Sequence, residues 1–166
     1  MLFLSKTVNG LIERVGYFFS WLWIATVIVI LISVISRYAF AQGSVMLEEI
    51  QWHMAGAAWL IGLSYTFVKD SHVRVDVLHE RFSAITRTRI EILGICFLFL
   101  PFMFITLWEL IPYSLSSFQQ GERSQAPNGL PFRWILKMLM PCAVTFLLLA
   151  GLARLVTSLF FLYGKR

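Results

Sequence analysis

Four long runs of apolar residues follow one another along the chain, and polar segments separate them. The first two runs are bounded by charges, since nothing is charged between Arg14 and Arg37 or between Glu49 and Lys69. A helix needs about 20 apolar residues to cross roughly 30 Å of hydrocarbon, and each run comes close to that length. The runs do not alternate as the strands of a membrane barrel do. The pattern therefore predicts four transmembrane helices, over about residues 15–37, 48–68, 90–117 and 132–160.

The polar segments between these runs complete a predicted all-α membrane domain over residues 1–166. A central loop covers residues 69–89, and an outer loop over residues 118–131 is rich in turn formers. Within residues 77–93, apolar side chains alternate with arginine and histidine. This mixture is typical of an amphipathic segment that lies on the membrane surface. The sequence thus predicts an interfacial segment between the second and third helices.

Composition and charge fit the same picture. The chain is 58% hydrophobic and 14% charged, whereas a soluble domain carries about a quarter charged residues. Its net charge of +5 would suggest a nucleic-acid partner in a soluble protein. In a membrane protein, an excess of Lys and Arg on the cytoplasmic side explains that charge, and we expect no nucleic acid.

The basic residues predict the orientation of the chain in the membrane. Four spans place both termini on one side, together with the central loop. That side collects ten of the 14 Lys and Arg residues, namely Lys6, Arg14, Lys69, Arg74, Arg81, Arg87, Arg89, Arg154, Lys165 and Arg166. The other side holds Arg37, Arg123, Arg133 and Lys137. The termini and the central loop are therefore expected in the cytoplasm.

The candidate chemistry is sparse, and we expect no catalytic residue, cofactor or metal. His53 is the one histidine inside a predicted span, while a membrane haem protein needs paired axial histidines. His72, Asp76 and His79 have a spacing that could hold a metal, but ion-paired loop residues are the better interpretation. The two cysteines lie inside apolar runs and fit buried small hydrophobes. The sequence does not predict an enzyme.

Charges near the helix ends suggest local pairing. Arg37 ends the first predicted helix, and Glu48 and Glu49 open the second, so we expect an ion pair between these ends. On the third helix, Glu91 and Glu109 lie about 27 Å apart. Both carboxylates can then reach water at opposite membrane faces, which favours an interfacial role for Glu109 over that of a buried proton carrier.

Two features could contact other helices or proteins. Ala58, Gly62 and Thr66 recur every four residues in the second helix, a spacing that lets another helix approach closely. The pattern leaves open whether that neighbour belongs to this chain. The outer loop could present a docking surface, with Glu122 and Arg123 as candidates.

Several motifs occur in a distinctive order between about residues 37 and 141. They are Ser36-Arg37-Tyr38, Leu47-Glu48-Glu49-Ile50-Gln51-Trp52, Trp59 with Gly62, His72-Val73-Arg74-Val75-Asp76-Val77, and Gly129-Leu130-Pro131 with Trp134 and Pro141. In this order, and with four predicted spans, the chain resembles the small membrane subunit of tripartite ATP-independent periplasmic (TRAP) transporters, the DctQ type.

The resemblance implies a multi-pass subunit of the bacterial inner membrane, with lipids as its neighbours. Its partner would be a large permease subunit that carries the substrate and sodium sites and moves like an elevator. A periplasmic substrate-binding protein would deliver an organic acid, such as sialic acid or a C4-dicarboxylate. The chain itself would be a scaffold without a transport site, so residues that select the solute are expected in its partners.

The resemblance also suggests candidates for subunit contacts. These are Arg37, Glu48, Glu49 and Trp52 at the periplasmic end, Trp59 and Gly62 within the second helix, and His72, Arg74 and Asp76 at the cytoplasmic end. Topological anchoring and helix-end pairing are the competing interpretation of the same residues. The alternative function is an autonomous carrier or channel that acts as a homo-oligomer, with His53, Glu109 and hydroxyl groups as its polar path.

Overall fold

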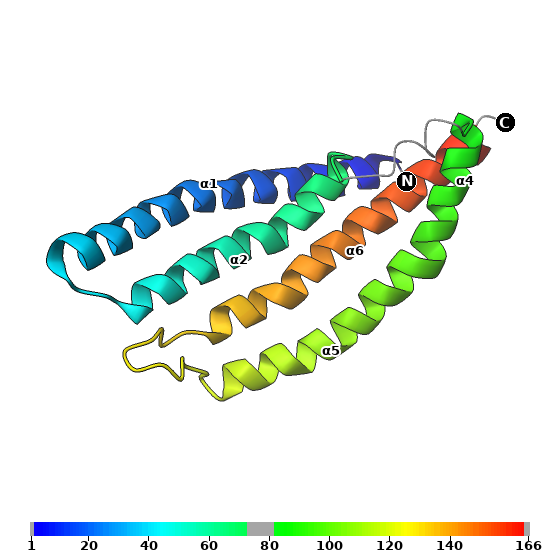
Figure 1. The fold of residues 1–166 in the computed structure, drawn as a ribbon. Coiled ribbons are helices and arrows are strands. Elements are labelled where there is room, and N and C mark those ends of the chain that lie inside the picture. The colour runs from blue at the N-terminus through cyan, green and yellow to red at the C-terminus, as the bar shows by residue number, and fades with distance from the viewer. Residues whose placement is uncertain (1, 73–81, 165–166) are drawn as a thin grey trace.

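The protein is a bundle of long helices (Figure 1). The computed structural model describes residues 2–72 and 82–164. Within this part of the chain every regular element is helical, which confirms the all-α class. The elements are α1 (Leu2–Phe40), α2 (Val45–Val68), α4 (Ala84–Gly94), the π-helical segment η1 (Ile95–Phe99), α5 (Leu100–Gln119) and α6 (Trp134–Tyr163).

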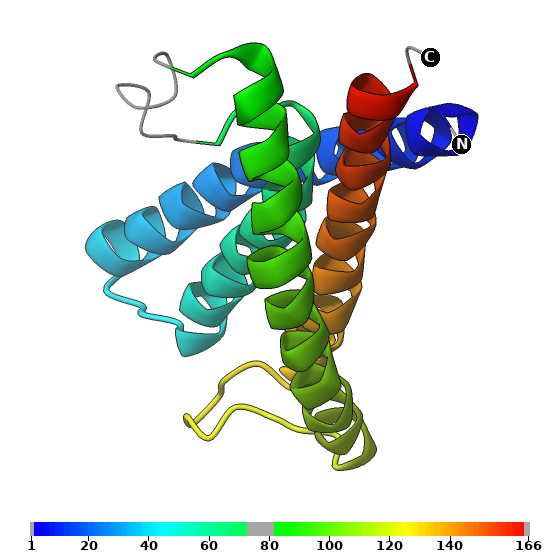
Figure 2. The ribbon, with the colours of Figure 1, turned by 90° about the vertical axis from the view of Figure 1, so that its right-hand side faces the viewer.

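Two helical hairpins pack together, with α6 at the centre. Residues 41–44 join α1 to α2, and residues 120–133 join α5 to α6. Helix α6 contacts α1, α2 and α5, and Figure 1 shows it between α2 and α5. Figure 2 shows that α1 leans across the other helices. Both chain termini lie at one end of the bundle, here called the terminal end, and the two hairpin connections lie at the other, the loop end (Figure 1).

Three helices of the described chain are long and apolar enough to cross a membrane, where the sequence analysis predicted four spans. They cover Phe3–Phe40, Ala84–Gln119 and Trp134–Tyr163. Helix α2 is not among them, although it runs beside its neighbours (Figure 1). Its first turns contain Glu48, Glu49 and other polar side chains.

The third long helix is continuous but bent. Helix α4, η1 and α5 follow one another without a break, so residues 84–93 of the predicted interfacial segment form the start of this helix. Residues 77–81 of that segment lie outside the described chain. Ser83 begins the helix, because its hydroxyl accepts a hydrogen bond from the Thr86 amide at 3.3 Å. The π-helical turn ends at Phe99, two residues before Pro101, whose ring nitrogen cannot donate to the helix, and such a combination bends helices.

Small side chains fill the interior of the bundle. Ala58 is 4% exposed and Ala150 is 2% exposed. Buried hydroxyl groups bond to the backbone of the neighbouring helix: Ser5 donates to the Ala153 carbonyl at 3.1 Å, and Ser114 donates to the Lys137 carbonyl at 2.8 Å. Small residues and such bonds let membrane helices approach closely.

Helix α6, η1 and α2 pack closely together near Gly151 of α6. A Cβ atom at this position would lie 2.2 Å from the ring of Phe99 in η1. The Phe99 ring in turn stacks on Phe67 of α2, with the ring centres 5.3 Å apart. By contrast, nothing lies within 4 Å of a Cβ built on Gly62, so that member of the predicted small-residue stripe faces open space.

Replacing Gly151 by alanine should destabilise the bundle. The added methyl group would overlap the Phe99 ring, which stacks on Phe67, and overpacking of this kind costs about 1–3 kcal/mol. Thermal unfolding of the purified protein in detergent measures the effect. Gly94→Ala is the matched control, because nothing lies within 4 Å of its Cβ. Equal melting temperatures for the two variants would contradict the packing described here.

Candidate functional site

Charged residues of the described chain gather at the two ends of the bundle and pair there. Three arrangements form at the loop end, around Glu49, Glu122 and Arg37. Another forms at the terminal end around Arg154. Each joins different helices or loops, so these contacts show how the ends of the helices are held together.

The carboxylate of Glu49 holds the outer loop against α2. Ser44 caps α2 by accepting a hydrogen bond from the Leu47 amide, which places Glu49 near the start of the helix. One oxygen of Glu49 accepts from the Ser124 hydroxyl at 2.5 Å, and the other accepts from the Leu130 amide at 2.6 Å. Both carboxylate oxygens therefore bind one loop, more than 70 residues further along the chain.

The loop is shaped to reach this carboxylate. The Ser124 amide donates to the Leu130 carbonyl at 3.0 Å and closes the loop on itself. Between them Asn128 has a φ of 58°, a left-handed conformation that asparagine tolerates better than most residues. A Cβ at Gly129 would lie 2.4 Å from the Ser124 hydroxyl oxygen and 3.0 Å from Glu49 Oε2. The Asn-Gly pair thus permits both the turn and the close approach.

A second carboxylate, Glu122, binds the first turn of α6. It accepts hydrogen bonds from Lys137 Nζ at 2.5 Å and from the Ser117 hydroxyl at 2.6 Å. The ammonium group of Lys137 also lies 4.4 Å from the centre of the Tyr113 ring. The hydrogen bonds from Lys137 and Ser117 hold the pKa of the Glu122 carboxyl below its ordinary value. The ammonium group of Lys137, whose side chain is largely buried, is thereby paired with the Glu122 carboxylate of the same chain.

Arg37 and Glu48 form the ion pair that was expected between α1 and α2. Both side chains are about half exposed, so the pair is accessible at the surface. It borders an open cleft of about 400 Å³, whose lining also includes Ser33, Gln51 and Trp52. Exposed pairs of this kind contribute little to stability, about 0–1 kcal/mol.

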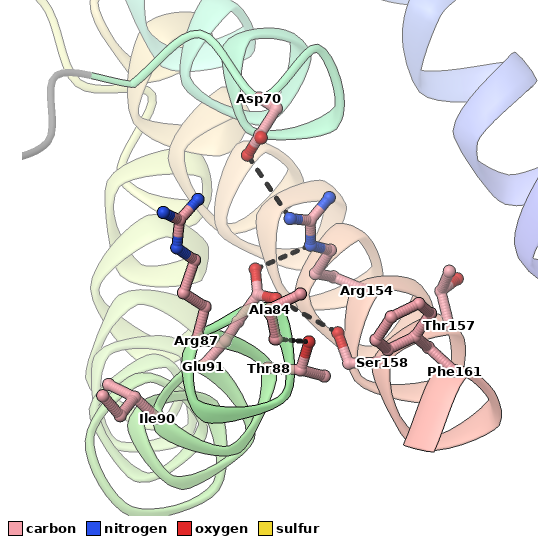
Figure 3. Close-up of a pocket in the computed structure, with 10 residues that line it drawn as sticks. All are labelled: Asp70, Ala84, Arg87, Thr88, Ile90, Glu91, Arg154, Thr157, Ser158 and Phe161. Atoms are coloured by element: carbon pink, nitrogen blue, oxygen red, sulfur yellow. Dashed lines mark hydrogen bonds and ion pairs between the residues drawn. The ribbon is translucent and has the colours of Figure 1, made fainter. Parts of the chain in front are cut away.

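At the terminal end, Arg154 of α6 joins two other segments (Figure 3). Its Nε donates to Glu91 Oε1 at 2.7 Å, and its Nη2 lies 3.6 Å from Asp70 Oδ1. The second oxygen of Glu91 accepts from the Ser158 hydroxyl at 3.2 Å. Asp70 follows α2 and Glu91 belongs to α4, so one guanidinium group connects three helices. An open cleft of about 560 Å³ lies beside this group, and Phe161 forms part of its wall.

The arrangement is that of a membrane protein whose helix ends are locked by ion pairs. A sequence model of a known family matches residues 26–161. That family is the DctQ component of tripartite ATP-independent periplasmic transporters. The chain belongs to the DctQ family. Searches of curated proteins and of solved structures found no match. As a DctQ-family protein, the chain is a small membrane component of a transporter, and the family is not one of enzymes.

The structure separates the residues predicted at the periplasmic end into different surroundings. Arg37 contacts Glu48, while the neighbouring Glu49 binds the outer loop instead. Trp52 is largely exposed. Trp59 is also exposed, and its ring centre lies 5.8 Å from that of Trp23. These positions leave both tryptophans accessible on the isolated chain of this DctQ-family protein.

Of the remaining predicted residues, His72 lies at the terminal end, and Glu122 and Arg123 lie in the outer loop. His72 Nε2 lies 3.2 Å from the Thr66 hydroxyl oxygen and 3.3 Å from the Leu63 carbonyl oxygen. Arg74 and Asp76 lie outside the described residues. In the outer loop, Arg123 is exposed, whereas Glu122 is bonded to Lys137 and Ser117.

Sequence reasoning missed the most connected groups, Arg154 with its two carboxylates and the Glu122–Lys137 pair. A signal was present, because Glu91, Lys137 and Arg154 interrupt apolar runs. An ionisable residue inside such a run is costly unless it has a partner. The partners themselves could not be named, since Arg154 and Glu91 are separated by 63 positions.

Replacing Glu49 by glutamine should loosen the outer loop. The amide keeps the size of the side chain but leaves one acceptor oxygen for two donors, and a hydrogen bond to a charged group is worth about 1.5–3 kcal/mol. Arg123 is an exposed trypsin site in the loop, so the cleavage rate after Arg123 measures loop opening. We expect that rate to rise about tenfold or more. Glu48→Gln is the matched control, because Glu48 pairs with Arg37. Equal cleavage of both variants and the wild type would contradict the clamp.

The Glu122 contacts should make stability depend on pH. A carboxyl group in an unfolded chain has a pKa of roughly 4.3, and the folded protein lowers that of Glu122. Its stabilising effect is therefore complete above about pH 5 and is lost as the pH falls through the folded pKa. Melting temperatures of wild type and Glu122→Gln should differ by a few degrees at pH 7 and converge toward pH 3. A difference that stays constant over this range would show that the carboxylate charge is not responsible.

Proposed function

We propose that this DctQ-family chain is the scaffold subunit of a TRAP transporter and that it supports a large permease subunit during sodium-driven uptake of an organic acid. A periplasmic binding protein delivers the acid, of the sialic acid or C4-dicarboxylate type. The large subunit provides the solute and sodium sites. The small subunit widens the fixed part of the assembly in the membrane.

The observation that carries this proposal is the large apolar surface of the bundle. In the most apolar stretches of α1 and of the α4–α5 helix, 11% of the residues are buried within the chain. The corresponding fraction in α6 is 22%. Meanwhile the interior is closely packed, with Ile61 and Ser64 of α2 fully buried. The chain therefore offers extensive outer faces to lipid or to a partner, as a scaffold requires.

The same features support an orientation in the bacterial inner membrane. Helix α2 has 24 residues, about 36 Å of helix, and runs beside the longer helices α1 and α6, so we assign it as the fourth span despite its polar first turns. The terminal end carries the larger share of Lys and Arg and is assigned to the cytoplasm. The loop end, with the Glu49 clamp, then faces the periplasm. A loop held in one shape can present Arg123 and its neighbours to a binding protein at a low cost in entropy.

The candidate contact residues take separate places in this proposal. Trp52 and Trp59 are exposed on α2, and the space beside Gly62 is open, so lipid or a protein neighbour can approach there. Arg37 and Glu48 stabilise the end of the same surface. His72 lies at the cytoplasmic end of α2, and Arg74 and Asp76 follow it in the sequence.

Reconstitution with the large subunit tests the proposal. The two chains should co-purify after gentle detergent extraction, and proteoliposomes holding both should take up the acid when the binding protein and an inward sodium gradient are supplied. Liposomes with the large subunit alone should fall to the background rate. Undiminished uptake by the large subunit alone would remove the need for this chain. Uptake by this chain alone would instead establish the autonomous carrier.

A further inference from the structure

The carboxylate of Glu109, on the outer surface of α5, has no partner among the described residues. Glu109 is exposed and belongs to the Ala84–Gln119 stretch that can cross a membrane. Its depth follows from the neighbouring helix, because Ser114 bonds to the Lys137 carbonyl near the start of α6. Glu109 precedes Ser114 by more than one helical turn and so lies about 7.5 Å further from the loop end. The carboxylate is thus located beyond the polar groups of that end.

The surface around this carboxylate is apolar. Phe102 and Ile105 share its face at helical spacing and are 63% and 67% exposed. The adjacent Trp108 is 78% exposed. The residues that α5 buries against the bundle, such as Met103 and Ser114, lie on its other side. This chain therefore leaves the face of Phe102, Ile105 and Glu109, here called the Glu109 face, uncovered.

Two hydrogen-bond acceptors lie on or beside this face, the Glu109 carboxylate and the Trp108 carbonyl. Within the described chain no ion pair or hydrogen bond involves the Glu109 carboxylate, and the cation of Lys137 is bonded to Glu122. Pro112 has no amide hydrogen to donate to the carbonyl of Trp108, four residues before it. A carboxylate and a backbone carbonyl that lacks its usual helical donor thus belong to neighbouring residues. A cation with several N–H groups complements both.

We propose that the Glu109 face is the docking surface for a transmembrane helix of the large subunit, which brings an arginine or lysine side chain to Glu109. This inference rests on the proposed function and assigns a surface to it. A carboxylate among apolar side chains in a membrane is costly when unpaired, and a cation at the same depth removes that cost and sets the register of the two helices. A second copy of this chain fits poorly, because a two-fold contact through this face would bring two Glu109 carboxylates together.

A photocrosslinking amino acid at position 105 tests the location of the contact in the assembled transporter. We expect an adduct with the large subunit. The same probe at Phe18, an exposed residue on α1, is the comparison. An adduct from position 18 alone, or adducts from position 105 with lipid or a second copy alone, would overturn the Glu109 face while leaving the scaffold intact. Failure of the two chains to co-purify at all would instead overturn the proposed function.

Charge variants test the pairing itself. Glu109→Gln should reduce retention of the large subunit about tenfold, and Glu109→Lys should reduce it further. Neither change should alter the melting temperature of the isolated chain, because the Glu109 side chain contacts no charged group of the described residues. Changes in the large subunit that restore binding to Glu109→Lys should replace an arginine or lysine. Wild-type retention by both variants, or restoring changes that leave every basic residue in place, would refute the pair.

Discussion

The close contact of α6 with its three neighbours is the constraint on which the rest of this structure depends. Lipid is as apolar as leucine, so burial from water does not drive membrane helices together. Here Ala150 and Gly151 have small side chains or none, so neighbouring helices can approach α6 closely. The hydroxyls of Ser5 and Ser114 donate hydrogen bonds to the α6 backbone. Dispersion contacts and these hydrogen bonds then stabilise the bundle. The position of α6 determines which charges can meet at the two ends.

The ion pairs follow from that packing. Arg154 reaches Glu91 and Asp70 because α6 lies between the segments that carry them, and Lys137 reaches Glu122 because α6 begins beside the outer loop. Removing one partner of a largely covered pair leaves an uncompensated charge, which costs more than the pair itself contributes. The pairs therefore act chiefly on register: they are satisfied in one arrangement of the helices and penalise others.

A bundle held together from within leaves its outer faces for contacts with other molecules. This division agrees with membership of the DctQ family, whose members are components of a multi-part transporter. The outer loop is bound to α2 through Glu49, while Arg123 remains exposed. The apolar faces of α1 and α5 are mostly uncovered by the chain. The outer faces are therefore available for contacts, and the packed interior holds them in place.

The sequence by itself determined the helical class, the family and the Arg37–Glu48 pair, because apolar runs and closely spaced charges are local properties. It did not fix where the helices begin, since α1 starts at Leu2 and the third long helix at Ala84, where the apolar runs predicted starts near residues 15 and 90. The span predicted over residues 48–68 forms helix α2, which is not among the helices long and apolar enough to cross a membrane, so that span stays a prediction. Only the tertiary structure decided that residues 84–119 form one bent helix, that Glu49 binds the loop and that Arg154 joins three segments. These contacts depend on distances between residues tens of positions apart, which helix packing alone sets.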